Sequence, residues 1–281
     1  MLRRIGIRVN TAKDTDFSVT KMLRDKLKQF GFEPVLYGEA AAHFGLPAID
    51  EISFLSQCDA VFVLGGDGTM LDIIANAAMR EIPIMGINMG RIGFLTEIEV
   101  NELDHVLRQL RQGEYHVEER MMLQCAYKDR ILYALNEFAV HRAVYECVIH
   151  LEICAGEHIV DGFFADGVIV ASPTGSTGYS LSAGGPILAP TIHAILLTPI
   201  CAHTLRSRPM VLDDQEIITI KTFGVGDASI MYDGKELALK GEEINIQIKR
   251  APFKAQFLRV KHSNFYKLLE MKLNEWSVPQ N

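Results

Sequence analysis

The hydrophobic periodicity of this chain changes near residue 118, and that change limits the possible folds more than any other feature. Before it, short apolar runs alternate with segments whose apolar residues recur at helical spacing. Such alternation is typical of a parallel sheet covered by helices, so we expect a Rossmann-like parallel α/β domain over residues 1–118. The expected strands are 4–9, 33–37, 60–64 and 82–88, and the expected helices are 17–30, 69–79 and 100–112.

After residue 118, apolar and polar residues alternate with a period of two, which is typical of half-buried strands. The clearest runs cover residues 148–154, 216–222 and 243–249. The pairs Asp161-Gly162 and Asp233-Gly234 have the composition of hairpin turns. We therefore expect a C-terminal antiparallel β-sandwich domain over residues 119–253, with a further helix at 264–275.

The length and charge of the chain exclude several classes of protein. The chain has 281 residues, which exceeds the usual size of one domain. Its formal net charge of −7 provides no overall basic field, so we expect no nucleic-acid partner. The apolar run 194–202 is shorter than the ~18 residues that a membrane span needs, so we expect no membrane partner. The five cysteines form no C-x-x-C pair and are expected to be reduced thiols in the cytoplasm.

Several familiar functional motifs are absent from the sequence. The first expected strand lacks the G-x-G-x-x-G turn of dinucleotide-binding units, and the chain has no G-x-x-x-x-G-K-[ST] phosphate loop. The histidines show no metal-ligand spacing such as H-E-x-x-H, so we expect no metal ligands. A different glycine turn, "GGDGT" at residues 65–69, remains as the candidate phosphate site.

This glycine turn lies between an expected strand and an expected helix. Gly65, Gly66 and Gly68 lack a Cβ, which permits positive φ and lets a ligand approach the backbone closely. The helix that follows offers unpaired N–H groups and a positive dipole end. Thr69 and Asp72 have the spacing of a capping box. Together these features predict a phosphate seat at the carboxyl end of a parallel strand.

Asp67 lies inside the turn and adds a negative charge where phosphates are expected. It can be a turn aspartate that bonds its own backbone. It can equally accept the proton of a hydroxyl group that attacks a phosphate, as an aspartate does in kinase sites. Mg²⁺ carried on the phosphate donor would then offset the charge. The residues alone leave both interpretations open.

A second polar cluster occupies residues 163–188, in the expected β domain. It carries small hydroxyl side chains among five glycines, which is typical of either a ligand-binding loop or an ordinary polar loop. Tyr179 offers a ring for stacking on a base, and Asp166 can bond an amide or a hydroxyl. Asn136 and Glu137 interrupt an apolar strand at adjacent positions and therefore face opposite sides. One of them can lie in the core only if it is paired.

Several segments, taken together, resemble the ATP-NAD kinase family. They are "GGDGT" (65–69), "NMGRIGFLTE" (88–97), "NE" (136–137), "DGVIVASPTGSTGYSLSAGGP" (166–186) and "PICAHTLRSRPMVL" (199–212). The resemblance implies an N-terminal α/β domain, a C-terminal β domain, an active site between them and a tail, 254–281, that packs back on the first domain. It implies transfer of the terminal phosphoryl group of ATP, or of polyphosphate, to the 2′-hydroxyl of the adenosine ribose of NAD. Mg²⁺ or another divalent cation would enter with ATP, and the protein would be a homodimer or homotetramer.

The resemblance also assigns roles to single residues. Asp67 would be the catalytic general base, and the three glycines of the turn would hold phosphates. Asn136 and Glu137 would bind NAD near the ribose, Phe94 would contact the adenine region, and Asp166 would face the nicotinamide end. The nucleoside pocket would be lined by Thr174, Thr177, Gly178, Tyr179, Ser180, Leu181 and Ser182.

The sequence departs from the family pattern at two positions. Gly178 stands where the family most often has Ala, and we expect little functional cost. Lys235 stands where many relatives have a neutral residue, and it can either reach a phosphate or remain a surface lysine. Two rival functions remain: a lipid kinase of the diacylglycerol-kinase type, which shares GGDGT, and a catalytically silent NAD-binding sensor. The sequence does not decide between ATP and polyphosphate, between NAD and NADH, or whether NADP inhibits.

Overall fold

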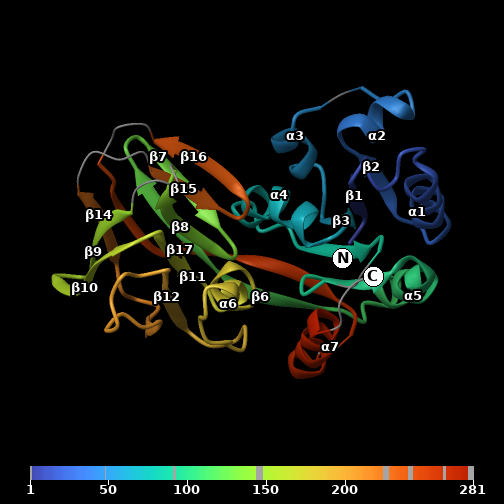
Figure 1. The fold of residues 1–281 in the computed structure, drawn as a ribbon. Coiled ribbons are helices and arrows are strands. Elements are labelled where there is room, and N and C mark those ends of the chain that lie inside the picture. Colours follow the sequence, from blue (N-terminus) through green and yellow to red (C-terminus); the bar gives the residue numbers. More distant parts are fainter. Residues whose placement is uncertain are drawn as a thin grey trace. The chain divides into compact units, whose positions relative to one another are not determined.

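The structure is a computed structural model that describes residues 2–47, 49–90, 93–143, 148–223, 228–239, 243–261 and 264–277. Its chain divides into two compact units (Figure 1). The first comprises Met1–Glu119 together with Gln256–Asn281, and the second comprises Arg120–Ala255. The tail therefore belongs to the same compact unit as the N-terminal half of the chain.

The first unit contains a parallel sheet with the strand order β2-β1-β3-β4. β5 pairs in parallel with the other edge of β4, where Phe257 of β17 also pairs with Ile84. These strands are β1 (Arg4–Val9), β2 (Glu33–Leu36), β3 (Ala60–Gly65), β4 (Ile84–Asn88) and β5 (Thr96–Glu99). The helices are α1 (Ser18–Gln29), α2 (Gly38–His43), α3 (Glu51–Leu55), α4 (Asp67–Ala78), η1 (Val100–Glu102), α5 (Leu103–Gln112) and α7 (Phe265–Ser277).

Helices cover both faces of this parallel sheet. On one face, α1 and α5 share a buried apolar cluster with alternate residues of the strands, such as Phe62 and Leu64 of β3. The intervening residues Val61 and Val63 point to the other face and are also fully buried. Helix α4 contacts β3 and β4 there, and Figure 1 shows it on the opposite side of the strands from α1 and α5. The predicted α/β class of this half is therefore confirmed.

The second unit is an antiparallel β-sandwich, as predicted. One sheet has the order β13-β12-β11-β8-β15-β16, and the other runs β10-β9-β14-β17, with β6 beside β17 and β7 beside β6. A single apolar core lies between them and takes residues from both. The elements are β6 (His116–Tyr127), β7 (Arg130–Ala134), β8 (Glu137–Arg142), β9 (Ile149–Ala155), β10 (His158–Ala165), β11 (Gly167–Ala171), η2 (Thr174–Thr177), α6 (Tyr179–Ser182), β12 (Ala194–Ile200), β13 (Met210–Asp213), β14 (Ile218–Phe223), β15 (Ala228–Tyr232), β16 (Lys235–Leu239) and β17 (Asn245–Arg259).

One of the two predicted hairpin turns is wrong. Asp233 and Gly234 do form the turn between β15 and β16, both with positive φ, 45° and 77°. Asp161 and Gly162, however, lie inside β10, next to an irregularity in its pairing with β9. The turn between those two strands contains Gly156, with φ 57°. Gly156 adopts the left-handed conformation, so the chain reverses there and the Asp161-Gly162 pair remains in the strand.

The helices differ from the expectations at two places. Helix α4 begins at Asp67, two residues before the expected start, and the short helices α2 and α3 were not expected. The tail helix α7 spans Phe265–Ser277 and confirms the helical periodicity of that segment. None of the helices in the part of the chain that the structure describes is long and apolar enough to cross a membrane.

Candidate active site

The glycine turn of the first unit does not use the conformational freedom that the sequence suggests. Gly65, Gly66 and Gly68 all lie outside the positive-φ region, so that part of the expectation is wrong. Gly65 is needed for a different reason, because a Cβ there would lie 2.4 Å from the Thr69 hydroxyl oxygen. A Cβ on Gly68 would meet nothing within 4 Å, so this side of the turn is open.

Thr69 is not the cap of α4, and the predicted capping box is therefore wrong. The helix begins at Asp67 with Gly66 as the N-cap, which places Thr69 at the third helical position. The Thr69 hydroxyl instead accepts a hydrogen bond of 3.1 Å from the side-chain amide of Asn10, which follows β1. This bond joins the end of β1 to the first turn of α4. The glycine turn is therefore held both by β3, which leads into it, and by the end of β1.

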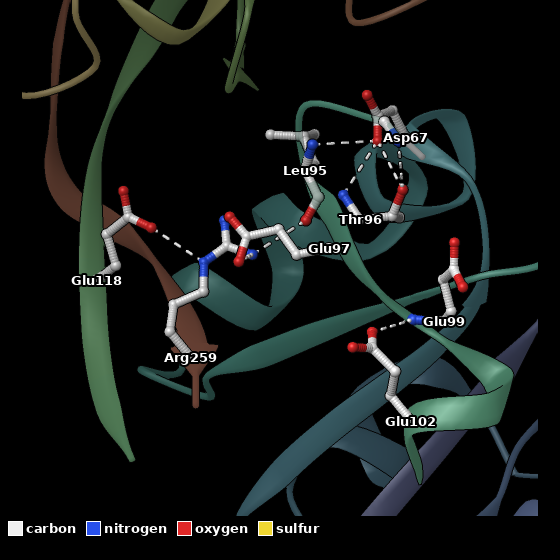
Figure 2. A network of polar contacts seen from close by, with 9 residues as sticks. Asp67, Leu95, Thr96, Glu97, Glu99, Glu102, Glu118 and Arg259 are labelled. Carbon is white, nitrogen blue, oxygen red and sulfur yellow. Dashed lines mark hydrogen bonds and ion pairs between the residues drawn. The ribbon is translucent and has the colours of Figure 1, made fainter. Parts of the chain in front are cut away.

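Asp67 is bound by the backbone of a distant segment (Figure 2). Its Oδ1 accepts N–H groups from Leu95 at 3.1 Å and Thr96 at 3.2 Å, and the Thr96 hydroxyl at 3.2 Å. Its Oδ2 accepts the N–H of Phe94 at 2.8 Å. One of the two sequence interpretations was that Asp67 bonds the backbone of its own turn. The hydrogen bonds of its carboxylate instead come from residues 94–96. Asp67 fixes the segment that leads into β5.

Gly93 makes this arrangement possible. A Cβ at Gly93 would lie 1.9 Å from Asp67 Oδ1 and 2.4 Å from its Cγ, so no side chain fits beside the carboxylate. The described contact of Phe94 with Asp67 is made by its main chain, which leaves the expected role of its ring in adenine binding a prediction. Residues 91 and 92 of the same motif lie outside the described residues.

The second unit contains a cavity of about 530 Å³. Three residues from the predicted set line it: Glu137, Asp166 and Tyr179. The structure does not place the others in its lining, which leaves out Asn136, Thr174, Thr177, Gly178, Ser180, Leu181 and Ser182. Sequence reasoning missed seven lining residues, namely His141, Arg142, Ala143, Ile200, Met231, Gly234 and Glu236.

The start of β8 is held by the β15–β16 hairpin. The carboxylate of Asp233 accepts the backbone N–H groups of Leu135 at 2.6 Å, Asn136 at 2.8 Å and Glu137 at 3.4 Å. These bonds fix the direction in which the Asn136 and Glu137 side chains leave the strand. The hairpin whose turn the sequence predicts correctly is therefore also the support of the predicted Asn-Glu pair.

One carboxyl oxygen of Glu137 has no hydrogen-bond partner in the part of the chain that the structure describes. Its Oε2 is buried without a hydrogen bond among the described residues, and a Cβ on Gly178 would lie only 3.1 Å from it. Burial, with the nearby Asp233 carboxylate as a smaller cause, raises the pKa of Glu137 to about 8, although the backbone N–H of Tyr179 opposes the shift. At neutral pH the group is therefore mostly a neutral acid that can donate a hydrogen bond into the cavity.

Asp166 and Tyr179 present different chemistry to the same cavity. Asp166 forms an ion pair with Arg142, with 3.1 Å between Oδ1 and Nε, so the local charge is balanced. Tyr179 is 39% exposed, and partial burial, followed by the nearby Cys201, Asp166 and Glu137, raises the pKa of its hydroxyl. Its ring is thus available for contact, and its hydroxyl is a neutral donor.

Most hydroxyl groups of the predicted polar loop form hydrogen bonds with other groups of the protein. Ser180 is fully buried and shares a 2.8 Å hydrogen bond with Thr198 of β12. The Thr177 hydroxyl donates to the carbonyl of Thr174 at 3.2 Å. A Cβ on Gly175 would lie 2.2 Å from the carbonyl oxygen of Asn136, so the loop packs directly on the Asn-Glu segment. The loop is a rigid support for the cavity wall.

Both the N-terminal and the C-terminal part of the chain match models of known protein families. Residues 5–115 match the model of the ATP-NAD kinase N-terminal domain, and residues 135–260 match that of the ATP-NAD kinase C-terminal domain. The chain belongs to the ATP-NAD kinase family. It is 39% identical to the NAD kinase of Desulforamulus reducens, with 97% of both chains covered. It is 37% identical to the NAD kinase of Caldanaerobacter subterraneus subsp. tengcongensis, with 98% of this chain and 100% of that protein covered.

Two solved structures share the fold of this ATP-NAD kinase family member. An NAD kinase from Archaeoglobus fulgidus in complex with ATP has a TM-score of 0.77 and 27% identity, covering 96% of this chain and 98% of that one. A yeast NADH kinase complexed with NADH has a TM-score of 0.88 and 24% identity, covering 100% of this chain and 89% of that one. The fold predicted from periodicity is therefore the fold of these kinases.

One cavity residue that the sequence analysis missed, His141, could have been predicted from the strand periodicity of this ATP-NAD kinase family member. Along β8, Phe138 and Val140 point into the core, so Glu137 and His141 share the opposite face. The period-two rule would have added His141 to the Glu137 prediction. Met231 and Glu236 come from β15 and β16, which the sequence does not place beside β8. Lys235 is exposed and does not line this cavity.

Protein-bound metal ions such as zinc are held by sets of His, Cys, Asp and Glu side chains. Among the residues that the structure describes, no three His, Cys, Asp or Glu side chains gather as metal ligands. The divalent cation that the family resemblance implies would be carried by ATP.

Proposed function

We propose that this chain is an NAD kinase that transfers the terminal phosphoryl group of ATP to the 2′-hydroxyl of the adenosine ribose of NAD, producing NADP. Membership of the family, with relatives named NAD kinase along nearly the whole chain, supports the reaction. The observation that carries the catalytic assignment is the Asp67 carboxylate, which is held by four donors at the open start of α4. Such a group keeps its direction while a substrate is bound.

The first unit supplies the phosphate seat in this proposal. Helix α4 is 12 residues long, and its first N–H groups are positioned to receive phosphate oxygens at the open Gly68 side of the turn. The Lys13 ammonium nitrogen lies 3.5 Å from the Cβ position of Gly66 and 3.7 Å from that of Gly90. A positive charge over the turn offsets the Asp67 carboxylate and favours a polyphosphate chain.

Asp67 would act as the general base through Oδ2. A carboxylate offers about four lone-pair positions. From the described residues, Oδ1 already accepts three hydrogen bonds, whereas Oδ2 accepts one. Oδ2 would therefore accept the hydrogen bond of the ribose 2′-hydroxyl. The hydroxyl oxygen forms a bond to the γ-phosphorus, the bond to the β–γ bridging oxygen breaks, ADP leaves, and the proton passes to Oδ2 and then to water.

The second unit would hold NAD in its cavity. The neutral Glu137 can donate to a ribose oxygen and, because it is uncharged, does not repel the pyrophosphate. The exposed ring of Tyr179 would stack on a base, and the paired Asp166 would bond the nicotinamide end. The other loop residues of the predicted set, and Asn136, would act by shaping the wall. The placement of the active site between the two domains stays a prediction of the resemblance.

The setting and assembly of the enzyme complete the proposal. The cysteines for which the structure gives a state are Cys58, Cys125, Cys154 and Cys201, and all are free thiols, which supports a reducing compartment such as the cytoplasm. Mg²⁺ or another divalent cation would arrive with ATP and neutralise the β- and γ-phosphates. The family resemblance further predicts a homodimer or homotetramer, which light scattering on the purified protein would measure.

A donor and acceptor panel tests this function. ATP, other nucleoside triphosphates and polyphosphate are offered with Mg²⁺, against NAD, NADH and diacylglycerol. We expect NADP from NAD with at least one triphosphate, and none without a divalent cation. Phosphorylation of diacylglycerol and not of NAD would show a lipid kinase. Tight NAD binding with no product from any donor would show a sensor.

A further inference from the structure

Arg259, near the C-terminal end of β17, is a buried cation inside the first unit. Its side chain is 4% exposed. It forms ion pairs with Glu97, at 3.2 Å from Nη1, and with Glu118, at 3.0 Å from Nε. The same Nη1 donates a hydrogen bond of 3.3 Å to the carbonyl oxygen of Leu95 (Figure 2). Two carboxylates therefore fix the plane of the guanidinium, and its Nη1 also donates to the carbonyl.

One peptide group connects Arg259 to the carboxylate of Asp67. The carbonyl of Leu95 and the N–H of Thr96 belong to the same peptide plane. The carbonyl oxygen accepts from Arg259 Nη1, and the N–H donates to Asp67 Oδ1 at 3.2 Å. Because a peptide group is planar, a guanidinium that holds its oxygen also sets the direction of its N–H. A donor on the oxygen further polarises the N–H toward the carboxylate.

The arrangement is specific to arginine. The guanidinium is a planar group with donors in a fixed fork, whereas lysine is a point charge on a flexible stem. Lysine at position 259 can neutralise Glu97 or Glu118, but it cannot hold both and also the Leu95 carbonyl in one plane. A purely electrostatic role would accept either residue, and a positioning role would not.

We propose that Arg259 is a positioning residue for Asp67, acting through the Leu95–Thr96 peptide. This inference rests on the proposed function, because it gives Asp67 the catalytic role. Arg259 keeps the Thr96 N–H directed at Oδ1, which holds the carboxylate with Oδ2 turned toward the acceptor hydroxyl. Substituting Arg259 therefore lowers the rate of phosphoryl transfer and leaves the binding sites for ATP and NAD intact.

The test compares Arg259→Lys and Arg259→Gln with the wild-type chain and with a matched control, Lys261→Gln. Lys261 lies two residues after the end of this strand and pairs with Glu102, which is not one of the described hydrogen-bond partners of Asp67. We expect kcat to fall roughly 10- to 100-fold in both Arg259 variants, which is less than the ~10²–10⁴-fold expected for loss of a general base. KM for ATP and for NAD should change less than threefold, and the control should keep wild-type kcat. Wild-type kcat in Arg259→Lys overturns the proposal, even if Arg259→Gln is impaired.

A double-mutant cycle separates positioning from general stability. In an Asp67→Asn background, Arg259→Lys should cause no further loss of kcat, because the group it positions is already altered. An equal fold-loss in both backgrounds overturns the proposal. If Asp67→Asn alone keeps wild-type turnover, the catalytic role of Asp67 fails, which is a separate result. If both Arg259 variants unfold at the assay temperature, Glu97→Gln loosens the same guanidinium, and unchanged kcat in that variant overturns the inference.

Discussion

Substitution of Glu137 by Gln should remove a large pH dependence from the stability of the protein. In the folded chain the pKa of Glu137 is raised from 4.5 to about 8, mainly by burial. The folded state therefore holds a proton that the unfolded state releases between these two values. The associated stability is complete below pH 4.5 and is lost as the pH rises through 8. A glutamine side chain has no proton to release in this range. The unfolding free energy of Glu137→Gln therefore does not show this decrease with rising pH.

The size of the effect follows from the two pKa values. Each pH unit between them is worth about 1.4 kcal/mol of unfolding free energy. The whole interval from 4.5 to about 8 then corresponds to roughly 5 kcal/mol as an upper limit. Between pH 5.5 and pH 7.5, the wild-type chain should lose roughly 3 kcal/mol relative to Glu137→Gln.

Urea unfolding at half-unit steps from pH 5 to pH 9 measures this difference directly. The quantity to plot is the unfolding free energy of Glu137→Gln minus that of the wild type, because other titrating groups cancel in it. Glu236→Gln is the matched control, since it makes the same chemical change at an exposed residue of the same cavity. We expect a rising difference for Glu137→Gln and a flat one for the control. A flat line for Glu137→Gln would refute the buried neutral acid.

Three other predictions follow from close contacts and burial. Gly93→Ala places a methyl group 1.9 Å from Asp67 Oδ1, so it should displace the carboxylate and lower kcat roughly 10²-fold in steady-state assays while the chain still folds. Gly175→Ala meets the backbone of Asn136 at 2.2 Å and should lower the unfolding free energy by roughly 1–3 kcal/mol in urea titrations, since backbone cannot move aside cheaply. Burial raises the thiol pKa of Cys58 and Cys125 to about 12, so mass spectrometry should find neither labelled by iodoacetamide at pH 8 until the protein unfolds.

Periodicity was sufficient for the fold because each strand and helix buries its own apolar face. The run 60–64 becomes β3, and the alternation at 216–222 becomes β14, almost as expected. The Asp161-Gly162 turn failed for a physical reason. The hairpin reverses at Gly156 once β9 and β10 pair with His150 opposite Phe164, and pairing between strands is not visible in one strand's sequence.

The candidate site was predictable in its motifs and not in its contacts. Asp67 was identified from the glycine turn, but its donors lie 27 to 29 residues away in sequence. Arg259 carries no motif at all, and only the folded chain brings its guanidinium to Leu95. Local patterns report neighbours within one element, whereas these bonds depend on how β4, β5 and β17 meet.

Rapid-quench measurement of a single turnover of Asp67→Asn tests whether Asp67 is the catalytic base. Enzyme in excess over NAD, with saturating ATP and Mg²⁺, reports the phosphoryl-transfer step without product release. We predict that transfer to the 2′-hydroxyl slows by ~10²–10⁴-fold while NAD and ATP bind with nearly wild-type Kd. A transfer rate equal to that of the wild type, or a loss confined to Kd, would contradict the assignment of Asp67 as the base.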